Sequence, residues 1–193
     1  MKAYCINLDS RPDKWEWISE ESKKLDLELV RFSGFKRNKG HEGCRLSHLT
    51  LLAELKDQGE FMIIEDDMEI CVDNPIELMN EAYSQLPEDW DMFYLGATLN
   101  QKLEQYSKNL YRLKAAWATQ AIIYNNQNGV VDYIIENHNQ PKFSVFLSND
   151  VQNNFNCYIT YPMIATQHAG MSDILRHYVD YKVITDRYKK YVG

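Results

Sequence analysis

Short apolar runs alternate with longer stretches of helical period through the first half of the chain, and this alternation is typical of α/β proteins. The runs that predict strands cover residues 3–8, 27–32, 61–64, 68–72 and 92–95. Two later runs, at 118–124 and 157–161, predict further strands. We expect these strands to form a mixed, mostly parallel central sheet with helices on both faces.

Helical spacing fills the intervals between these runs. Ser10 can cap a first helix, and Pro12 fits its first turn. Apolar residues at helical spacing predict further helices over 44–56, 75–83 and 129–136. No internal repeat or low-complexity linker interrupts the chain, so we predict one domain over 1–170, followed by a Tyr-rich, helical tail over 171–193 that packs on it.

Composition narrows the classes of function. The chain has 193 residues, 45% of them hydrophobic, which is enough for a substantial core. Its net charge of -7 argues against nucleic acid as a partner. Four widely spaced cysteines without a C-x-x-C pair predict reduced thiols. The sequence shows neither a signal-peptide pattern nor a run of roughly 20 apolar residues, so we expect a soluble, cytoplasmic protein whose tail allows peripheral membrane contact.

Three consecutive carboxylates, Glu65, Asp66 and Asp67, follow the buried run at 61–64. Like charges a few ångströms apart repel, so a divalent cation is their natural counter-charge, and oxygen ligands favour Mg²⁺ or Mn²⁺. Alternation along a strand predicts that Glu65 and Asp67 share one side and that Asp66 points to the other. The alternative is a solvated acidic turn without a ligand.

Several blocks together carry a family resemblance. They are Ile6-Asn-Leu8 with Arg11, Gly43-Cys-Arg-Leu-Ser-His48, Ile63-Ile-Glu-Asp-Asp67, Tyr94-Leu-Gly96, Asn149-Asp150, Tyr161-Pro162 and Gln167. In order and spacing the chain resembles glycosyltransferase family 25, which includes lipopolysaccharide glycosyltransferases and collagen galactosyltransferases. The blocks span roughly residues 3 to 175, and the Gly43 to His48 block followed by the acidic strand end is the most specific part.

The resemblance implies a GT-A-like, nucleotide-sugar-binding fold, a UDP-sugar donor such as UDP-galactose, a divalent metal and inversion at the anomeric carbon. Asp67 is the first choice for coordinating Mn²⁺ or Mg²⁺, with Glu65 beside it and Asp66 near the nucleotide sugar. Glu65 stands where the family's Asp-x-Asp signature more often has Asp, a departure that bears on the metal requirement.

Other candidate residues follow from the same blocks. Asp150 is the predicted general base, although it can equally be the N-cap of a helix. His168 can complete the metal shell or serve only a structural role. Ser47 and His48 lie on the helix opened by Gly43, where they can meet a phosphate, or His48 can fill a hydrogen-bonding position in the core.

Two residues of the first block complete the predicted site. Asn7 ends the first strand, where open sheets bind ligands, so it can meet the uracil or ribose. Arg11 follows in the next loop and can pair with the diphosphate, or it can be an ordinary surface charge.

The sequence therefore predicts a metal-dependent, inverting glycosyltransferase that moves a hexose from a UDP-sugar to a glycan or glycoprotein acceptor. A non-catalytic carbohydrate-binding or assembly subunit is the alternative from another class. A sugar-phosphate nucleotidyltransferase ranks lower, because the loop at 9–13 lacks the glycines of a phosphate-binding loop.

Overall fold

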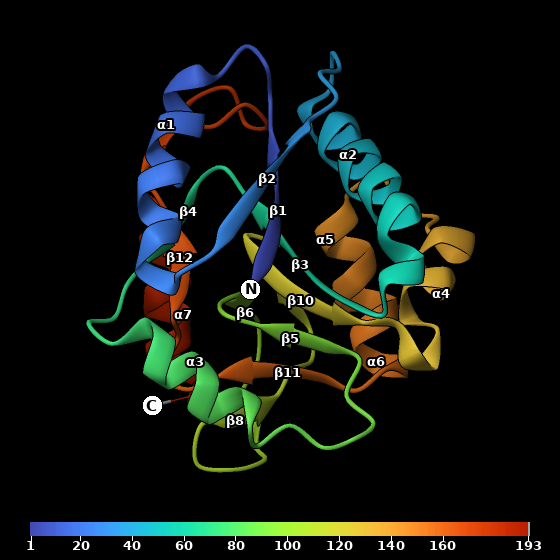
Figure 1. Cartoon of the computed structure of the whole chain (residues 1–193), viewed down its shortest axis with the longest axis vertical. Helices are drawn as coiled ribbons and strands as arrows, with labels where there is room; N and C mark the ends of the chain where they lie inside the picture. Colours follow the sequence, from blue (N-terminus) through green and yellow to red (C-terminus); the bar gives the residue numbers. More distant parts are fainter. Residues whose placement is uncertain (193) are drawn as a thin grey trace.

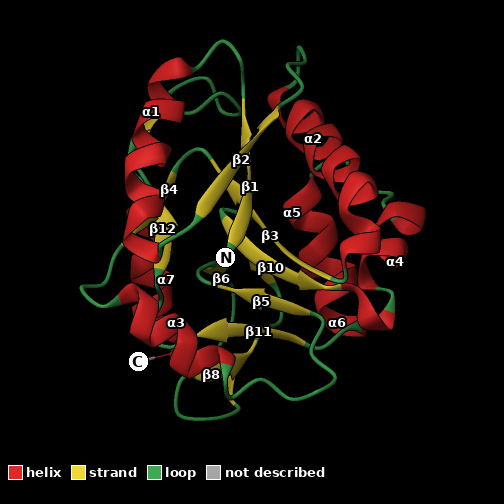
Figure 2. Cartoon of the chain, in the orientation of Figure 1, coloured by secondary structure: helices red, strands yellow, loops and turns green. Residues whose placement is uncertain are grey.

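A mixed sheet of eight strands forms the centre of the protein (Figures 1 and 2). The computed structural model describes residues 1–192. In spatial order the strands are β2 (Glu28–Ser33), β1 (Lys2–Asn7), β3 (Glu60–Glu65), β10 (Ala121–Asn125), β5 (Met92–Tyr94), β11 (Cys157–Thr160), β8 (Leu110–Arg112) and β7 (Glu104–Gln105). Strands β10 and β8 run against the direction of all the others. The sheet is therefore mixed and mostly parallel, as predicted.

Helices cover both faces of this sheet, which confirms the predicted layers (Figure 1). On one face α1 (Pro12–Glu21) and α3 (Pro75–Tyr83) bury apolar side chains, including Ile18 and Leu78, in a cluster with β1 and β3. On the other face lie α2 (Gly40–Leu55), α4 (Val130–Asn137) and α5 (Phe143–Phe146), whose apolar side chains join a second cluster. The central strands are buried on both sides, which explains their nearly continuous apolar sequence.

Three neighbouring parallel strands place polar side chains at one edge of the sheet. Strand β1 pairs in parallel with both β2 and β3, and Asn7, Ser33 and Glu65 are the last residues of these strands. Because parallel strands end on the same side, the loops that follow them converge there. This edge is where the candidate site forms.

Shorter elements complete the fold. The two-stranded pairs are β4 (Met68–Ile70) with β12 (Ala165–Gln167), β6 (Thr98–Leu99) with β9 (Ala116–Trp117), and β13 (Gly170–Met171) with β14 (Tyr178–Val179). A π-helical turn (Leu147–Val151) joins α5 to α6 (Gln152–Asn154), and single 3₁₀ turns follow α1, α2 and β10. The pairing of β4 with β12 brings residues about a hundred positions apart in sequence beside the acidic cluster.

The chain ends in helix α7 (Lys182–Val192), which packs against β6 and β12. Its side chains Ile184, Tyr188 and Val192 are buried in the same cluster as α2 and α4. The division into a domain and a tail at residue 170 stays a prediction. Within residues 1–192, none of the helices combines the length and apolar character that a bilayer crossing requires.

Candidate functional site

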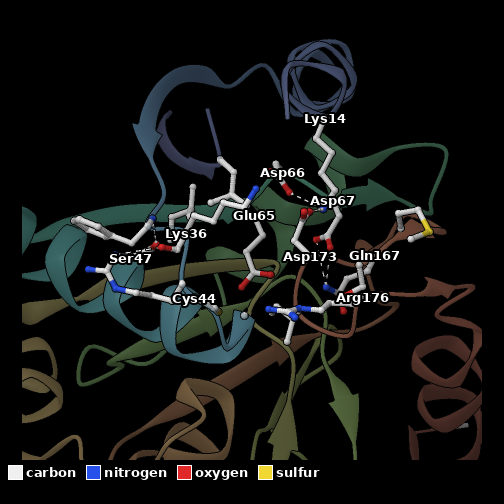
Figure 3. Close-up of a pocket in the computed structure, with 18 of the residues that line it drawn as sticks. Lys14, Lys36, Cys44, Ser47, Glu65, Asp66, Asp67, Gln167, Asp173 and Arg176 are labelled. Atoms are coloured by element: carbon white, nitrogen blue, oxygen red, sulfur yellow. Dashed lines mark hydrogen bonds and ion pairs between the residues drawn. The ribbon is translucent and has the colours of Figure 1, made fainter. Parts of the chain in front are cut away.

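The three predicted carboxylates lie together in one cleft of about 420 Å³ at the edge of the sheet (Figure 3). Strand β3 ends at Glu65, and Asp66 and Asp67 form the turn into β4. Glu65 meets His48 on α2, whereas Asp66 meets Lys14 on α1, so these two carboxylates point to opposite faces of the sheet, as strand alternation predicts. Asp67 lines this cleft and a second one on the other side of the turn, so it does not lie on the side of Glu65 alone.

Glu65 is held by hydrogen bonds from two other elements. His48 on α2 lies 3.0 Å from its Oε1 through Nε2, and the hydroxyl of Thr119 donates to the same oxygen. Burial alone would raise the pKa of Glu65, but the bonds from His48 and Thr119 lower it below its usual value. Glu65 therefore stays ionised and fixed in place.

Asp66 is compensated by a cation and an amide. The side-chain amide of Asn7 donates to Oδ2 at 2.8 Å, and the ammonium of Lys14 lies 3.2 Å from Oδ1. Asp66 is buried, and this burial raises its pKa despite both partners. Asn7 is itself buried and also accepts hydrogen bonds from Arg31, so it supports Asp66 from beneath the cleft and does not line it.

Asp67 receives the weakest compensation of the three. Gln167 on β12 donates its amide to both carboxylate oxygens, at 3.2 and 3.3 Å. Burial, together with the charge of Glu65, raises the pKa of Asp67 to about 7. Three clustered carboxylates offer only oxygen ligands, and the raised pKa of Asp67 shows that their negative charges are not fully balanced by a counter-charge. This donor set fits a divalent cation such as Mg²⁺ or Mn²⁺.

Lys14 and Arg11 of the β1–α1 region supply positive charge at the same place. The ammonium of Lys14 lies 3.3 Å from Asp173, and a guanidinium nitrogen of Arg11 lies 2.5 Å from the same carboxylate. Burial would lower the pKa of Lys14, but Asp67, Asp66 and Asp173 outweigh it and raise the pKa to about 12. Lys14 is therefore a permanent cation between the acidic turn and the Asp173 loop.

The loop around Asp173 forms one wall of the cleft and meets the start of α2. Arg176 donates to the backbone carbonyl of Asn38. A Cβ on Gly40 would lie 2.6 Å from Cα of Ile174, and a Cβ on Gly43 would lie 2.2 Å from the carbonyl oxygen of Phe35. Glycine at these two positions is what allows the three backbone segments to approach so closely.

A second cleft of about 390 Å³ lies on the other side of the acidic turn. Asp66, Asp67 and Lys14 line both clefts. The second one is also lined by Trp17 and His168, whose rings stack with centroids 3.8 Å apart. The backbone amide of His168 donates to the carbonyl of Asp67 at 2.7 Å, so the stack is tied to the acidic turn.

The structure brings most of the predicted residues to this place. Ser47, His48 and the three carboxylates line the first cleft, Arg11 and His168 line the second, and Asn7 supports Asp66. The hydroxyl of Ser47 is occupied, because it donates to the carbonyl of Gly43 and accepts from the amide of Phe35. The side chain of Ser47 thus shapes the entry into α2.

Asp150 is the exception. It lies inside the helical stretch formed by α5, the π-helical turn and α6, so the prediction that it begins a helix is wrong. Its carboxylate accepts hydrogen bonds from Tyr133 and Asn154, at 2.7 and 2.9 Å. Asp150 lines neither cleft.

Sequence reasoning missed several residues of the site. Lys14 and Trp17 are three residues apart on the first helix, so they share a face, but nothing in the sequence said which face meets the acidic turn. Asp173 lies in the tail, where no motif signalled a function. The sequence predicts no role for Cys44 beyond that of a reduced thiol, although its spacing from His48 places both residues on one face of α2.

The chain shares its fold with solved structures of very different sequence. One is A197 from STIV, with 10% identity, a TM-score of 0.55 and 92% of each chain covered. Another is a glycosyltransferase involved in the glycosylation of the major capsid of PBCV-1, with 8% identity, a TM-score of 0.55, and 91% of this chain and 95% of that chain covered. At such identities the likeness concerns the fold, and it confirms the predicted GT-A-like architecture.

Sequence comparison adds no family. No family model matches the chain. No curated protein matches it either. Membership of glycosyltransferase family 25 therefore stays a prediction.

Proposed function

We propose that this protein is a metal-dependent, inverting glycosyltransferase that moves galactose or a related hexose from a UDP-sugar to a hydroxyl of a glycan or glycoprotein. The observation that carries the proposal is the position of Asp66 and Asp67, which line both clefts at the carboxyl edge of the sheet. A transferase needs such a junction, because donor and acceptor must meet at one reacting carbon. The shared fold with a glycosyltransferase supports this reading.

The first cleft suits the nucleotide-sugar donor. Apolar side chains such as Leu8 and Phe35 can cover the base, while Lys14, Arg37 and Arg176 line the same cleft with positive charge. Cations of this kind pair with diphosphate oxygens, and guanidinium groups do so with two parallel hydrogen bonds. We assign the diphosphate to the region between these cations and the acidic turn.

Asp67, with Glu65 beside it, is the proposed holder of Mn²⁺ or Mg²⁺. The raised pKa of Asp67 fits this role, because a cation would replace the proton that burial otherwise favours. When bound there, the cation would neutralise charge on the departing diphosphate. His168 stays a further candidate ligand, with its ring already held against Trp17.

The second cleft suits the acceptor glycan. Sugar rings pack on aromatic faces, and the stacked rings of Trp17 and His168 offer such a surface beside the acidic turn. The acceptor oxygen attacks the anomeric carbon as the bond from that carbon to the diphosphate breaks. The hydroxyl proton passes to Asp66, which lines both clefts and whose pKa is raised by burial.

A donor-hydrolysis and transfer assay tests the proposal. We expect the protein to release UDP from a UDP-hexose with Mn²⁺, and we expect Asp67→Asn to lower this rate by at least about 100-fold. Asp57→Asn, an exposed carboxylate in the turn after α2, is the matched control and should keep the full rate. Glycan binding without any metal-dependent UDP binding would instead identify a non-catalytic carbohydrate-binding subunit.

The same assay decides between Asp66 and Asp150 as the base. Asp150→Asn should keep near-normal transfer if Asp66 receives the proton, and Asp66→Asn should then lose transfer. Loss of transfer in Asp150→Asn with unchanged UDP affinity would return the role to Asp150. Isothermal titration with UDP and Mn²⁺ measures the affinity in each variant.

A further inference from the structure

We infer that Cys44, His48 and Glu65 form a second cation site, selective for a thiophilic divalent ion such as Zn²⁺ and distinct from the all-oxygen site at Asp67. Binding of Zn²⁺ at this site does not rest on the proposed transfer reaction. The site is built from one thiol, one imidazole and one carboxylate.

The geometry brings three ligand atoms together. Cys44 and His48 lie four residues apart on α2, so they project from the same face one turn apart. Glu65 reaches them from the end of β3, with its Oε1 3.0 Å from Nε2 of His48. Their ligand atoms all lie within 4.8 Å of one another. Tetrahedral zinc bonds of ~2.0–2.3 Å set ligand atoms roughly 3.3–3.8 Å apart, so side-chain rotations that bring the three atoms closer would close the site.

His48 provides an independent sign that a ligand belongs here. Its side chain is 1% exposed, and its ring stacks on Phe143 with centroids 4.6 Å apart. Nε2 meets Glu65, but in residues 1–192 the buried Nδ1 has no hydrogen-bond partner. A buried polar atom without a partner is costly, and a cation bound at Nδ1 would be that partner while the Nε2–H donates to Glu65.

The donor chemistry separates this site from the one at Asp67. Thiolate and imidazole ligands select zinc, whereas carboxylates alone select magnesium or manganese. On binding, the Cys44 thiol gives its proton to solvent and the sulfur bonds to the metal. Three protein ligands leave a fourth position that faces the cleft, since all three residues line it.

Glu65 connects the two sites. When the Glu65 carboxylate binds zinc, it is no longer available to the cation proposed at Asp67, two residues along the chain. If the proposed transfer reaction holds, micromolar zinc inhibits it and excess Mn²⁺ does not displace the zinc. This consequence alone rests on the proposed function, whereas binding of Zn²⁺ itself does not.

Cobalt titration tests the site directly, because a cobalt ion bound to sulfur shows a near-ultraviolet charge-transfer band. We expect the band in the reduced, full-length protein, with displacement by Zn²⁺ and not by Mg²⁺. Cys44→Ser should remove the band and weaken Zn²⁺ binding by more than about 100-fold, since even second-shell losses cost about 10- to 100-fold. Cys71→Ser, the matched control on an exposed cysteine outside both clefts, should keep it.

Two further measurements make the result decisive. Asp67→Asn should retain the cobalt band while losing Mn²⁺ binding, which shows that the sites are separate. In the unmodified protein, Zn²⁺ should slow alkylation of Cys44 and leave Cys71 unaffected, so the test survives a variant that fails to fold. Absence of the band in the unmodified protein, or its persistence in Cys44→Ser, overturns the inference.

Discussion

The three adjacent carboxylates differ because each has a different kind of partner. Glu65 meets an imidazole and a hydroxyl, Asp66 meets an ammonium and an amide, and Asp67 meets only an amide. The pKa of Glu65 falls, and the pKa values of the two aspartates rise. Partner chemistry, and not position in the triplet, decides which group stays ionised at neutral pH.

Asp67 makes the stability of the metal-free protein depend on pH. The folded protein keeps a proton on Asp67 up to about pH 7, whereas the unfolded chain releases it near pH ~4. Within this window folding takes up a proton, so the free energy of unfolding falls as the pH rises, by at most about 4 kcal/mol. Urea unfolding at several pH values measures this fall.

Asp67→Asn removes the group that titrates. We expect its free energy of unfolding to fall less between pH 5 and 8, to a degree set by the remaining raised carboxylate of Asp66. Asp57→Asn, on the surface, should behave like the unmodified protein. Identical pH profiles for Asp67→Asn and the unmodified protein would refute the raised pKa.

For single residues, the sequence predicted the acidic turn at Glu65 to Asp67 and the nearby Asn7 at the end of an adjacent strand. It did not predict Lys14 or Asp173, because pairing between α1 and the loop after β13 depends on tertiary packing. It also misplaced Asp150, whose position in a block of polar residues resembles a helix start although the helix has already begun at Phe143. Single-residue roles follow from contacts that the local sequence does not contain.

Among the elements, the strands with a clear apolar run were predictable, including the three-residue β4 and β5, whereas the two-residue strands were not. Strands β1, β2 and β3 carry apolar runs of clear period, and each lies within a residue or two of its predicted range. Two-residue strands such as β6 and β9 are too short to show a period. The helical stretch from Phe143 was missed because it combines α and π turns, which do not share one periodicity.

Helix α2 depends on glycine where it meets the Phe35 loop. In the middle of a helix, a Gly→Ala change normally raises the free energy of unfolding by about 1 kcal/mol, because alanine has the higher helix propensity. Here the new Cβ would lie 2.2 Å from the Phe35 carbonyl oxygen, and overpacking of backbone costs about 1–3 kcal/mol or more. We therefore expect Gly43→Ala to lower the free energy of unfolding, measured with urea, by about 1–2 kcal/mol.

Gly170→Ala is the matched control for this prediction. A Cβ at this position meets nothing within 4 Å, and the backbone there is not left-handed. Its free energy of unfolding should change by no more than about 0.5 kcal/mol. A stabilised Gly43→Ala would mean that the Phe35 loop yields freely to the added methyl group.

On the scale of the whole molecule, the last helix belongs to the core. Ile184 on α7 is 1% exposed and joins the cluster under α2 and α4, whereas its neighbour Val183 is 48% exposed. We expect Ile184→Ala to lower the free energy of unfolding by about 2–5 kcal/mol. Val183→Ala, one residue away on the same helix, should change the free energy of unfolding by no more than about 0.5 kcal/mol.

Denaturant unfolding followed by circular dichroism and by tryptophan fluorescence checks this pair. A single transition seen by both probes would mean that α7 unfolds with the sheet. A separate early transition, or equal effects of Ile184→Ala and Val183→Ala, would mean that α7 contributes little to the core.

The order of the strands also limits how the protein can meet copies of itself. The sheet ends at β2 on one side and at the two-residue β7 on the other. Glu28 and Arg31 put charge along β2, and short or charged border strands are poor templates for a further strand from another chain. Concentrated solutions should accordingly resist the strand-by-strand polymerisation to which open sheets are prone.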